Sequence, residues 1–362
     1  MMRWIFVGVM FLHGLIHLMG FSKAFGFASF EQLTKPISRG AGVAWLAAAF
    51  LLLAAIFLLA TARPFWWMVA LPAAILSQIL IFTVWHDARF GTLANVALLI
   101  TGVIAAGTWF FHRQAAQHRL DLQQNIQPLE AARDSSRTPL PTIVQTWLVR
   151  SGVFDRPHDR HVTLTQRGKM RTKPDGHWMA FSASQEFSID PPAFVWQTEV
   201  NMMPGIFMLG EDRYHHGHGE MGITLLGLVP VVHSSGPEID QGTLLRYLGE
   251  SCWFPSAALS PYMEWKPVDD RRASATFTYG DVSATGTFTF NEQGDITDFE
   301  ALRYGEFEGV KRLERWHISC ADHKPMDGVR VPTSCVVSWK LPEGNFRWLE
   351  LTLETVTRKG WE

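Results

Sequence analysis

The first third of the chain carries almost no charge, and this limits the fold more than any other feature. Residues 1–112 contain two acidic and six basic side chains, whereas the whole chain has 34 acidic and 32 basic ones. Four apolar runs in this segment reach the length of about 20 residues that a helix needs to cross a bilayer. We therefore predict a four-helix transmembrane bundle in residues 1–112. The spans are expected at residues 4–21, 41–61, 65–85 and 92–111.

Tryptophans near the ends of these runs also indicate a membrane location, because helices that cross a bilayer commonly carry aromatic side chains at its interfaces. They are Trp4, Trp66, Trp67, Trp85 and Trp109. The lipid bilayer is thus an expected partner, and the bundle is a candidate surface for homo-oligomerisation. Four spans place the N-terminus and the C-terminal domain on the same side. The loop charges lean only slightly towards a cytoplasmic C-terminal domain, so the sequence leaves the side undecided.

Residues 113–141 are predicted to connect the bundle to a second domain. Helix-forming residues continue from the fourth run to Gln124, which predicts a juxtamembrane helix. From Asn125 to Pro141 the chain is rich in proline, serine and aspartate, a composition typical of a linker.

Residues 142–362 predict a soluble, mainly antiparallel β domain. After a short helix at 142–151, strand-length runs rich in β-branched and aromatic residues alternate with turns such as Lys173–Gly176. Connections this short require antiparallel neighbours. One helical segment, Gln241 to Ser251, interrupts the strands. We therefore predict a curved sheet or half-barrel with one or two packed helices.

One stretch of this domain is specific enough to indicate a family. Arg246 to Pro255 reads RYLGESCWFP, and further agreement lies at Trp265, at Arg303-Tyr304 and in DGVRVPT at 327–333. With these residues, positions 140–358 resemble the DUF6544 (formerly DUF6920) family of bacterial proteins. The resemblance implies no reaction, and with the apolar runs it implies a bacterial inner membrane. By fold analogy the strand pattern is similar to the LolA/LolB-type lipoprotein carriers, whose incomplete β-barrel holds acyl chains on its concave face.

A pair of histidines, His13 and His17, lies inside the first apolar run. At a spacing of four residues they share one helix face. They either bond to Ser77, Gln78 or Asn95 across the bundle, or ligate a haem or another metal, or relay protons. We expect the interhelical hydrogen bonds.

A second histidine cluster, Asp212 to Glu220, includes His216 and His218. On a straight strand these two side chains would share one face, and His-x-His is a familiar zinc spacing. Gly217 and Gly219 instead favour a hairpin that scatters them. No cofactor is therefore predicted, with haem or zinc as the alternative.

The motif of the predicted helix supplies the candidate ligand-binding residues Arg246, Glu250, Trp253 and Phe254. Glu250 either pairs with Arg246, four residues back, or is a buried acid with a raised pKa at a cavity mouth. Trp253 and Phe254 either pack the helix onto the sheet or line the cavity entrance. The sequence alone does not separate these alternatives.

Three hypotheses for function follow from this reading. The leading one is a membrane-anchored β half-barrel that binds a lipid or another apolar small molecule. The second is a metal- or haem-dependent membrane enzyme that uses one of the histidine clusters, and the third is a structural or interaction protein of the membrane. The charge balance does not suggest a nucleic-acid partner. Three cysteines without close spacing predict free thiols, with one disulfide as the alternative.

Overall fold

The structure, a computed structural model, describes residues 2–126 and 140–360. Most of the predicted linker lies outside these residues. The chain divides into two compact units. Residues Met1–Arg113 with Leu226–Leu228 form the first unit, and Gln114–Leu225 with Val229–Glu362 form the second.

The N-terminal unit is helical, as the sequence predicts, but one helix is shorter than expected. Three of the described helices, Arg3–Ala24, Arg39–Ala60 and Gly91–Gln124, are long and apolar enough to cross a membrane. The predicted span 65–85 is divided at Val84, whose φ of −125° and ψ of 40° are not helical, and its main helix has 17 residues. The bounds are α1 Met2–Ala24, α2 Arg39–Ala60, α3 Trp67–Thr83, α4 Trp85–Ala88 and α5 Gly91–Gln124. The prediction that the last helix continues to Gln124 is confirmed.

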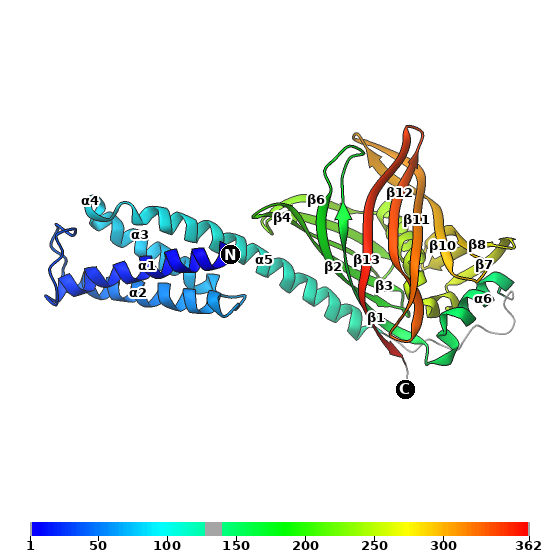
Figure 1. The fold of residues 1–362 in the computed structure, drawn as a ribbon, viewed down its shortest axis with the longest axis horizontal. Helices are drawn as coiled ribbons and strands as arrows, with labels where there is room; N and C mark the ends of the chain where they lie inside the picture. Colours follow the sequence, from blue (N-terminus) through cyan, green and yellow to red (C-terminus); the bar gives the residue numbers. More distant parts are fainter. Residues whose placement is uncertain (1, 127–139, 361–362) are drawn as a thin grey trace. The chain divides into compact units, whose positions relative to one another are not determined.

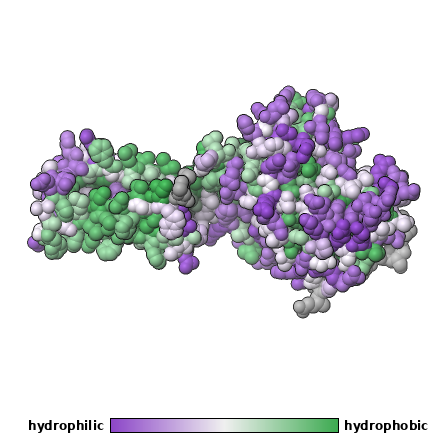
Figure 2. All heavy atoms as spheres, in the orientation of Figure 1, coloured by the Kyte–Doolittle hydropathy of each residue, from purple (hydrophilic) through white to green (hydrophobic). Residues whose placement is uncertain are grey.

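Alanines contribute many of the buried contacts in this unit, and many large apolar side chains are exposed on its outside. Ala70, Ala73 and Ala74 are fully buried, whereas Phe57 and Leu93 are 67% and 71% exposed. Hydrophobic residues accordingly cover much of this unit's surface in Figure 2. Small residues at helix contacts and an apolar exterior are typical of helices packed in lipid. In water so large an apolar surface would drive association.

The second unit is built on one antiparallel sheet of 13 strands (Figure 1). The sheet order is β6-β5-β4-β3-β2-β1-β13-β12-β11-β10-β9-β8-β7. The strands of the first half are β1 Asp159–Met170, β2 Met179–Ser188, β3 Ala193–Met203, β4 Ile206–His215, β5 His218–Leu225 and β6 Val229–Ser235. Those of the second half are β7 Met263–Asp269, β8 Arg272–Tyr279, β9 Val282–Phe290, β10 Ile296–Phe307, β11 Val310–Met326, β12 Val329–Leu341 and β13 Gly344–Gly360.

The order shows two meanders, β1–β6 and β7–β13, that join where β1 pairs with β13. Residues 236–262 connect the two outer edges of the sheet. They form α7 Pro237–Glu250 and the short 3₁₀ helices η2 Ser251–Trp253 and η3 Pro255–Leu259. Helix α7 packs against β4, β5 and β6 of one meander and β8, β9 and β10 of the other. We call the face of the sheet that α7 covers the inner face, and the opposite one the outer face.

The two strands that the sequence pattern missed, β6 and β7, are the edge strands. Each contains a proline, Pro230 or Pro267. Proline cannot donate a ladder hydrogen bond and is therefore tolerated at a sheet edge, but it hides a strand from a pattern-based prediction. The other predicted strands are present, several with longer bounds.

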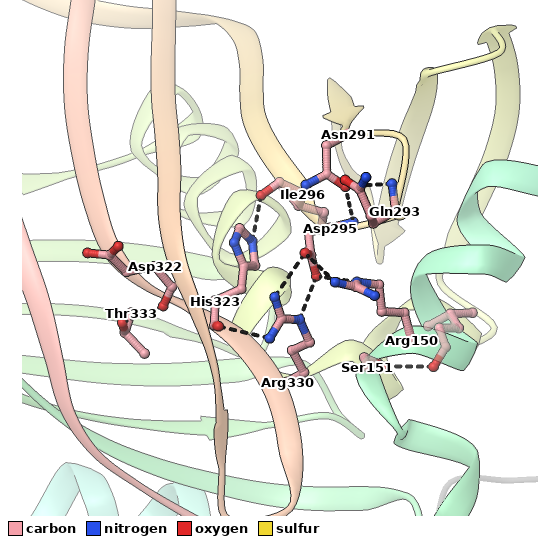
Figure 3. Close-up of polar contacts among 11 residues, drawn as sticks. Arg150, Ser151, Asn291, Gln293, Asp295, Ile296, Asp322, His323, Arg330 and Thr333 are labelled. Atoms are coloured by element: carbon pink, nitrogen blue, oxygen red, sulfur yellow. Dashed lines mark hydrogen bonds and ion pairs between the residues drawn. The ribbon is translucent and has the colours of Figure 1, made fainter.

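The remaining helical pieces, α6 Thr142–Ser151 and η1 Val153–Asp155, pack apolar side chains into the core, and one carboxylate also links α6 to the sheet. Asp295, which follows β9, accepts paired hydrogen bonds from Arg150 of α6 at 2.9 and 3.1 Å. It accepts another pair from Arg330 of β12 at 2.8 and 3.0 Å (Figure 3). Burial raises the pKa of the Asp295 carboxyl, but the hydrogen bonds from both arginines outweigh burial and hold it well below its ordinary value.

Replacing Asp295 with alanine should destabilise the β domain by about 2–3 kcal/mol, because two guanidinium groups lose charge-assisted partners. Because the folded-state pKa is lowered, this stabilisation is present above the ordinary value of 3.8 and is lost as the pH falls below it. Thermal unfolding of the purified chain between pH 6 and pH 2 should therefore show a steeper acid loss for the wild type than for Asp295→Asn. Asp281→Ala, in an exposed turn, is the control. An equal effect of both alanine substitutions at pH 6 would contradict this role.

Candidate functional site: a buried charge network on the inner face

The clearest chemical feature of the β domain is an arginine held between two carboxylates on the inner face. Arg246 of α7 donates from Nη1 to Asp212 Oδ2 at 2.6 Å and from Nε to Glu250 Oε1 at 2.8 Å. Gln185 of β2 donates from Nε2 to the other Glu250 oxygen at 2.7 Å. The predicted pairing of Arg246 with Glu250 is therefore present. The network ties the helix to β2 and β4.

Aromatic rings surround this network and exclude most of the water. The guanidinium of Arg246 lies 5.2 Å from the ring centre of Phe194 and 4.7 Å from that of Trp196. Trp196 in turn donates from Nε1 to Gln166 Oε1 at 3.1 Å. A cation between aromatic faces gains from their negative quadrupoles. The rings of Phe194 and Trp196 thus stabilise the positive charge of Arg246, and they also shield the carboxylates from solvent.

The carboxylates respond to this environment in the direction that desolvation dictates. Burial raises the pKa of the Glu250 carboxyl, and the charge and hydrogen bond of Arg246 oppose the shift. Burial likewise raises the pKa of Asp212, again against the opposing charge of Arg246. The sequence left two alternatives for Glu250: an acid paired with Arg246, or a buried acid with a raised pKa. In the structure Glu250 is both.

A second arginine, Arg303 of β10, lies beside the network. Its guanidinium carbon is 4.7 Å from the ring centre of Trp316. Burial and the like charge of Arg246 lower the pKa of Arg303 to about 10, and Asp212 and Glu250 oppose the shift. Within residues 2–126 and 140–360, no hydrogen bond or ion pair of Arg303 is found.

Several of these residues could have been located from strand alternation, because side chains two apart share a face. Arg303 is in phase with the buried Phe299 and Ala301. Gln185 is likewise in phase with Phe181 and Phe187. A polar residue in a buried phase is the signal that sequence reasoning missed. This signal would still not have shown that strands of two separate meanders place these side chains beside one helix.

Methionines line the inner face beyond the network. One lies on each of five adjacent strands, β1 to β5: Met170, Met179, Met202, Met208 and Met221. Met170 faces Met179 across its strand pair, and Met221 faces Asp212. Met202 is 39% exposed, and the other four are half-buried. Flexible, polarisable methionine side chains adapt to irregular apolar shapes. We call these five residues the methionine surface.

The two aromatic residues predicted as ligand-binding lie elsewhere. Phe254 is fully buried, with its ring centre 4.3 Å from that of Phe187. Trp253 is buried and donates from Nε1 to the Pro332 carbonyl at 3.1 Å. Its own carbonyl accepts from Arg358 at 2.6 Å. Both side chains therefore pack η2 and its flank onto the sheet, because the chain must turn back to the sheet after α7.

The segment Asp212 to Glu220 forms the hairpin that its glycines favour. A turn with positive φ at His216 and Gly217 joins β4 to β5, so the pattern is a hairpin and the straight-strand reading of His216 and His218 is wrong. The His218 side chain is 81% exposed, with Nδ1 at 3.5 Å from Asp240. In the part of the chain that the structure describes, no three His, Cys, Asp or Glu side chains come together as metal ligands.

His13 of α1 takes part in hydrogen bonds across the helices, as expected, whereas His17 bonds within its own helix. His13 Nε2 lies 3.0 Å from Asn95 Oδ1 and 3.2 Å from Ser77 Oγ. Asn95 in turn donates to Gln78 at 3.0 Å. His17 Nδ1 lies 2.9 Å from the carbonyl of His13. These contacts satisfy His13 and Asn95, whereas Nε2 of His17 is buried without a hydrogen-bond partner among the described residues.

The three cysteines are free and buried. Cys320 and Cys335 face each other across β11 and β12, with sulfur atoms 3.8 Å apart.

Comparison with known proteins places the domain in a family. The model of DUF6544, described as a family of unknown function, matches residues 130–351. The chain belongs to the DUF6544 family. The match covers the network and the methionine surface, and it leaves out the N-terminal helices. A search of curated proteins found none that matches the chain.

Two solved structures show a distant likeness to this member of the DUF6544 family. A DUF1329 family protein from Desulfovibrio piger shares 9% identity over 62% of this chain and 94% of its own, with a TM-score of 0.36. A LolA superfamily protein from Nitrosomonas europaea shares 10% identity over 60% and 94%, with a TM-score of 0.33. Because both TM-scores are below 0.5, nothing about a ligand is inferred from them.

Replacing Arg246 should show how far the buried carboxylates of Asp212 and Glu250 destabilise the fold when they have no counter-charge. We expect Arg246→Met to destabilise the folded chain by about 3–5 kcal/mol, because two buried acids lose their counter-charge. The folded-state pKa of both acids is already raised, and the variant raises it further. Stability is then fully present below the ordinary values of 3.8 and 4.5 and is lost as the pH rises through the raised ones. The variant should therefore regain stability between pH 8 and pH 5 more steeply than the wild type, measured by thermal unfolding.

The triple variant Asp212→Asn, Arg246→Met, Glu250→Gln is the matched control. It removes both carboxylates together with their counter-charge and leaves Arg303 as the cation of this region, so part of the lost stability should return. A triple variant less stable than Arg246→Met would show that the network itself holds the fold.

Proposed function

We propose that this protein is anchored in the bacterial inner membrane by its N-terminal helices and binds a lipid or another apolar ligand on the inner face of its β domain. The methionine surface carries the proposal. It places apolar, partly exposed side chains along five adjacent strands, on the face that otherwise forms the core. Apolar side chains exposed on this face of the strands would be covered by a bound apolar ligand.

The position of the surface relative to the network supports an amphipathic ligand. The deeper part of the inner face is filled by α7 and by buried aromatic residues such as Phe277 and Phe288. Asp212 and Met208 lie on the same face of β4, four residues apart, which corresponds to about 13 Å along a strand. An apolar chain on the methionine surface would therefore extend away from the charged groups. The apolar helices in the same chain support a bilayer as the source of such a ligand.

Two substitutions test this function. Met179→Asp and Met208→Asp should each lower the amount of lipid that co-purifies with the full chain by at least tenfold, because burying one methionine contributes about 1.5–3 kcal/mol and a charge reverses the gain. The measurement is mass spectrometry of the organic extract after purification in detergent, with lipid counted per mole of protein.

Leu302→Asp and Leu313→Asp are matched controls, since both leucines are about half exposed on the outer face of β10 and β11. They should retain the wild-type amount of lipid. Equal lipid in all five proteins would assign the lipid to the helices and overturn the proposal, as would a wild type without any lipid beyond the detergent-exchange background.

A further inference from the structure

Arg303 is a cation without a counter-ion in contact. Its guanidinium carries five N–H donors, a set that proteins normally satisfy with carboxylates or carbonyls. Among the described residues none of these donors has a hydrogen-bond acceptor, and the guanidinium lies against the face of Trp316. The side chain is nevertheless half-buried on the inner face. A guanidinium that is partly shielded from water and has no counter-ion in contact can gain from an anion that joins it.

The acids around Arg303 are already engaged by other groups. Asp212 and Glu250 are bound by Arg246 at 2.6 and 2.8 Å. Glu314, which faces Arg303 across the strand pair, lies 3.6 Å from Arg312. The carboxylates of the protein therefore balance Arg303 only at longer range, and its donor groups stay available.

Two neighbouring residues favour access and supply a second donor. Gly242 of α7 lies against Arg303: a Cβ at this glycine would be 3.5 Å from Arg303 Nε, so its absence keeps the helix from covering the guanidinium with a side chain. Trp316 Nε1 is buried and has no hydrogen-bond partner among the described residues. An indole N–H can only donate. The indole N–H of Trp316 thus requires an acceptor, and the donors of Arg303 are free to bind one.

We infer that Arg303 binds the anionic head group of the apolar ligand, a carboxylate or a phosphate. The inference rests on the proposed function, because it assigns one end of the ligand that the methionine surface would hold. The guanidinium forms paired hydrogen bonds with an oxyanion, and the stacked Trp316 ring orients it for them. The ligand class is therefore an acyl chain with a negatively charged head.

The test compares two probes that differ only at the head. Spin-labelled stearic acid and its methyl ester are titrated into the full chain held in phosphatidylcholine nanodiscs, with empty nanodiscs as the background. The immobilised fraction in the electron paramagnetic resonance spectrum gives the affinity of each probe. We expect the wild type to bind the carboxylate at least tenfold more tightly than the ester, or about 1.4 kcal/mol.

Variants assign this preference to one side chain. Arg303→Met should lower the affinity for the carboxylate to that for the ester and leave the ester unchanged, and Arg303→Lys should restore part of the preference. Arg315→Met is the matched control, because Arg315 is an exposed cation on the outer face of the adjacent strand. It should behave as the wild type. Unlabelled palmitate or dodecyl phosphate should displace the labelled acid, the better competitor identifying the head, whereas dodecanol should not.

Each alternative result has one meaning. If the wild type binds both probes equally, the head-group role of Arg303 is wrong while the proposed function stands. If it binds neither above the empty nanodiscs, the proposed function fails and the inference fails with it. If Arg303→Met weakens both probes by the same factor, the side chain acts through packing, and the head-group role is again overturned.

Discussion

The burial of α7 against both halves of the sheet is the contact on which the other features depend. An open sheet of 13 strands has two edges and one apolar face to cover. The segment that connects the edges supplies the cover, so a single element closes the topology and completes the core. Helix α7 is buried on nearly all sides, including Leu244, Leu245 and Tyr247. The polar side chains of α7 are buried in the same interior. Each of them therefore needs a hydrogen-bond partner there, because a buried polar group without one costs stability.

The charge network follows from that requirement. A buried ion pair rarely adds stability compared with apolar residues of similar volume, because desolvation offsets the attraction. Two arginines and two acids in one apolar layer are therefore weakly explained by stability alone. Arg246 is fully engaged, whereas Arg303 is not, and this asymmetry separates a group that holds the helix from a group that is available to a ligand. The methionine surface next to the network gives the same interior an adaptable apolar part.

Much of this arrangement could be predicted from the residues. Alternation and short turns predict the antiparallel sheet, and the apolar runs predict the helical first unit. The His13 contacts with Ser77 and Asn95 follow from the need to satisfy polar groups among apolar helices. The edge strands were missed because Pro230 and Pro267 interrupt their patterns. The length of α3 was overestimated because the apolar run, Phe65 to Trp85, extends two residues beyond each end of the helix. The site was predicted only in part: Arg246 and Glu250 form a local pair, which spacing along a helix shows. Asp212, Gln185 and Arg303 come from distant strands, and only the order of the strands in the sheet brings them to that pair.

The facing thiols of Cys320 and Cys335 have a consequence for the cellular setting of the domain. A disulfide needs its sulfur atoms at about 2.05 Å, so the pair at 3.8 Å is unbridged but already adjacent on neighbouring strands. Oxidising compartments join such neighbours during folding, and the cytosol keeps them reduced. Because both thiols are then sealed in the core, their redox state is retained after folding. The pair is thus a chemical record of the redox compartment in which the β domain folded.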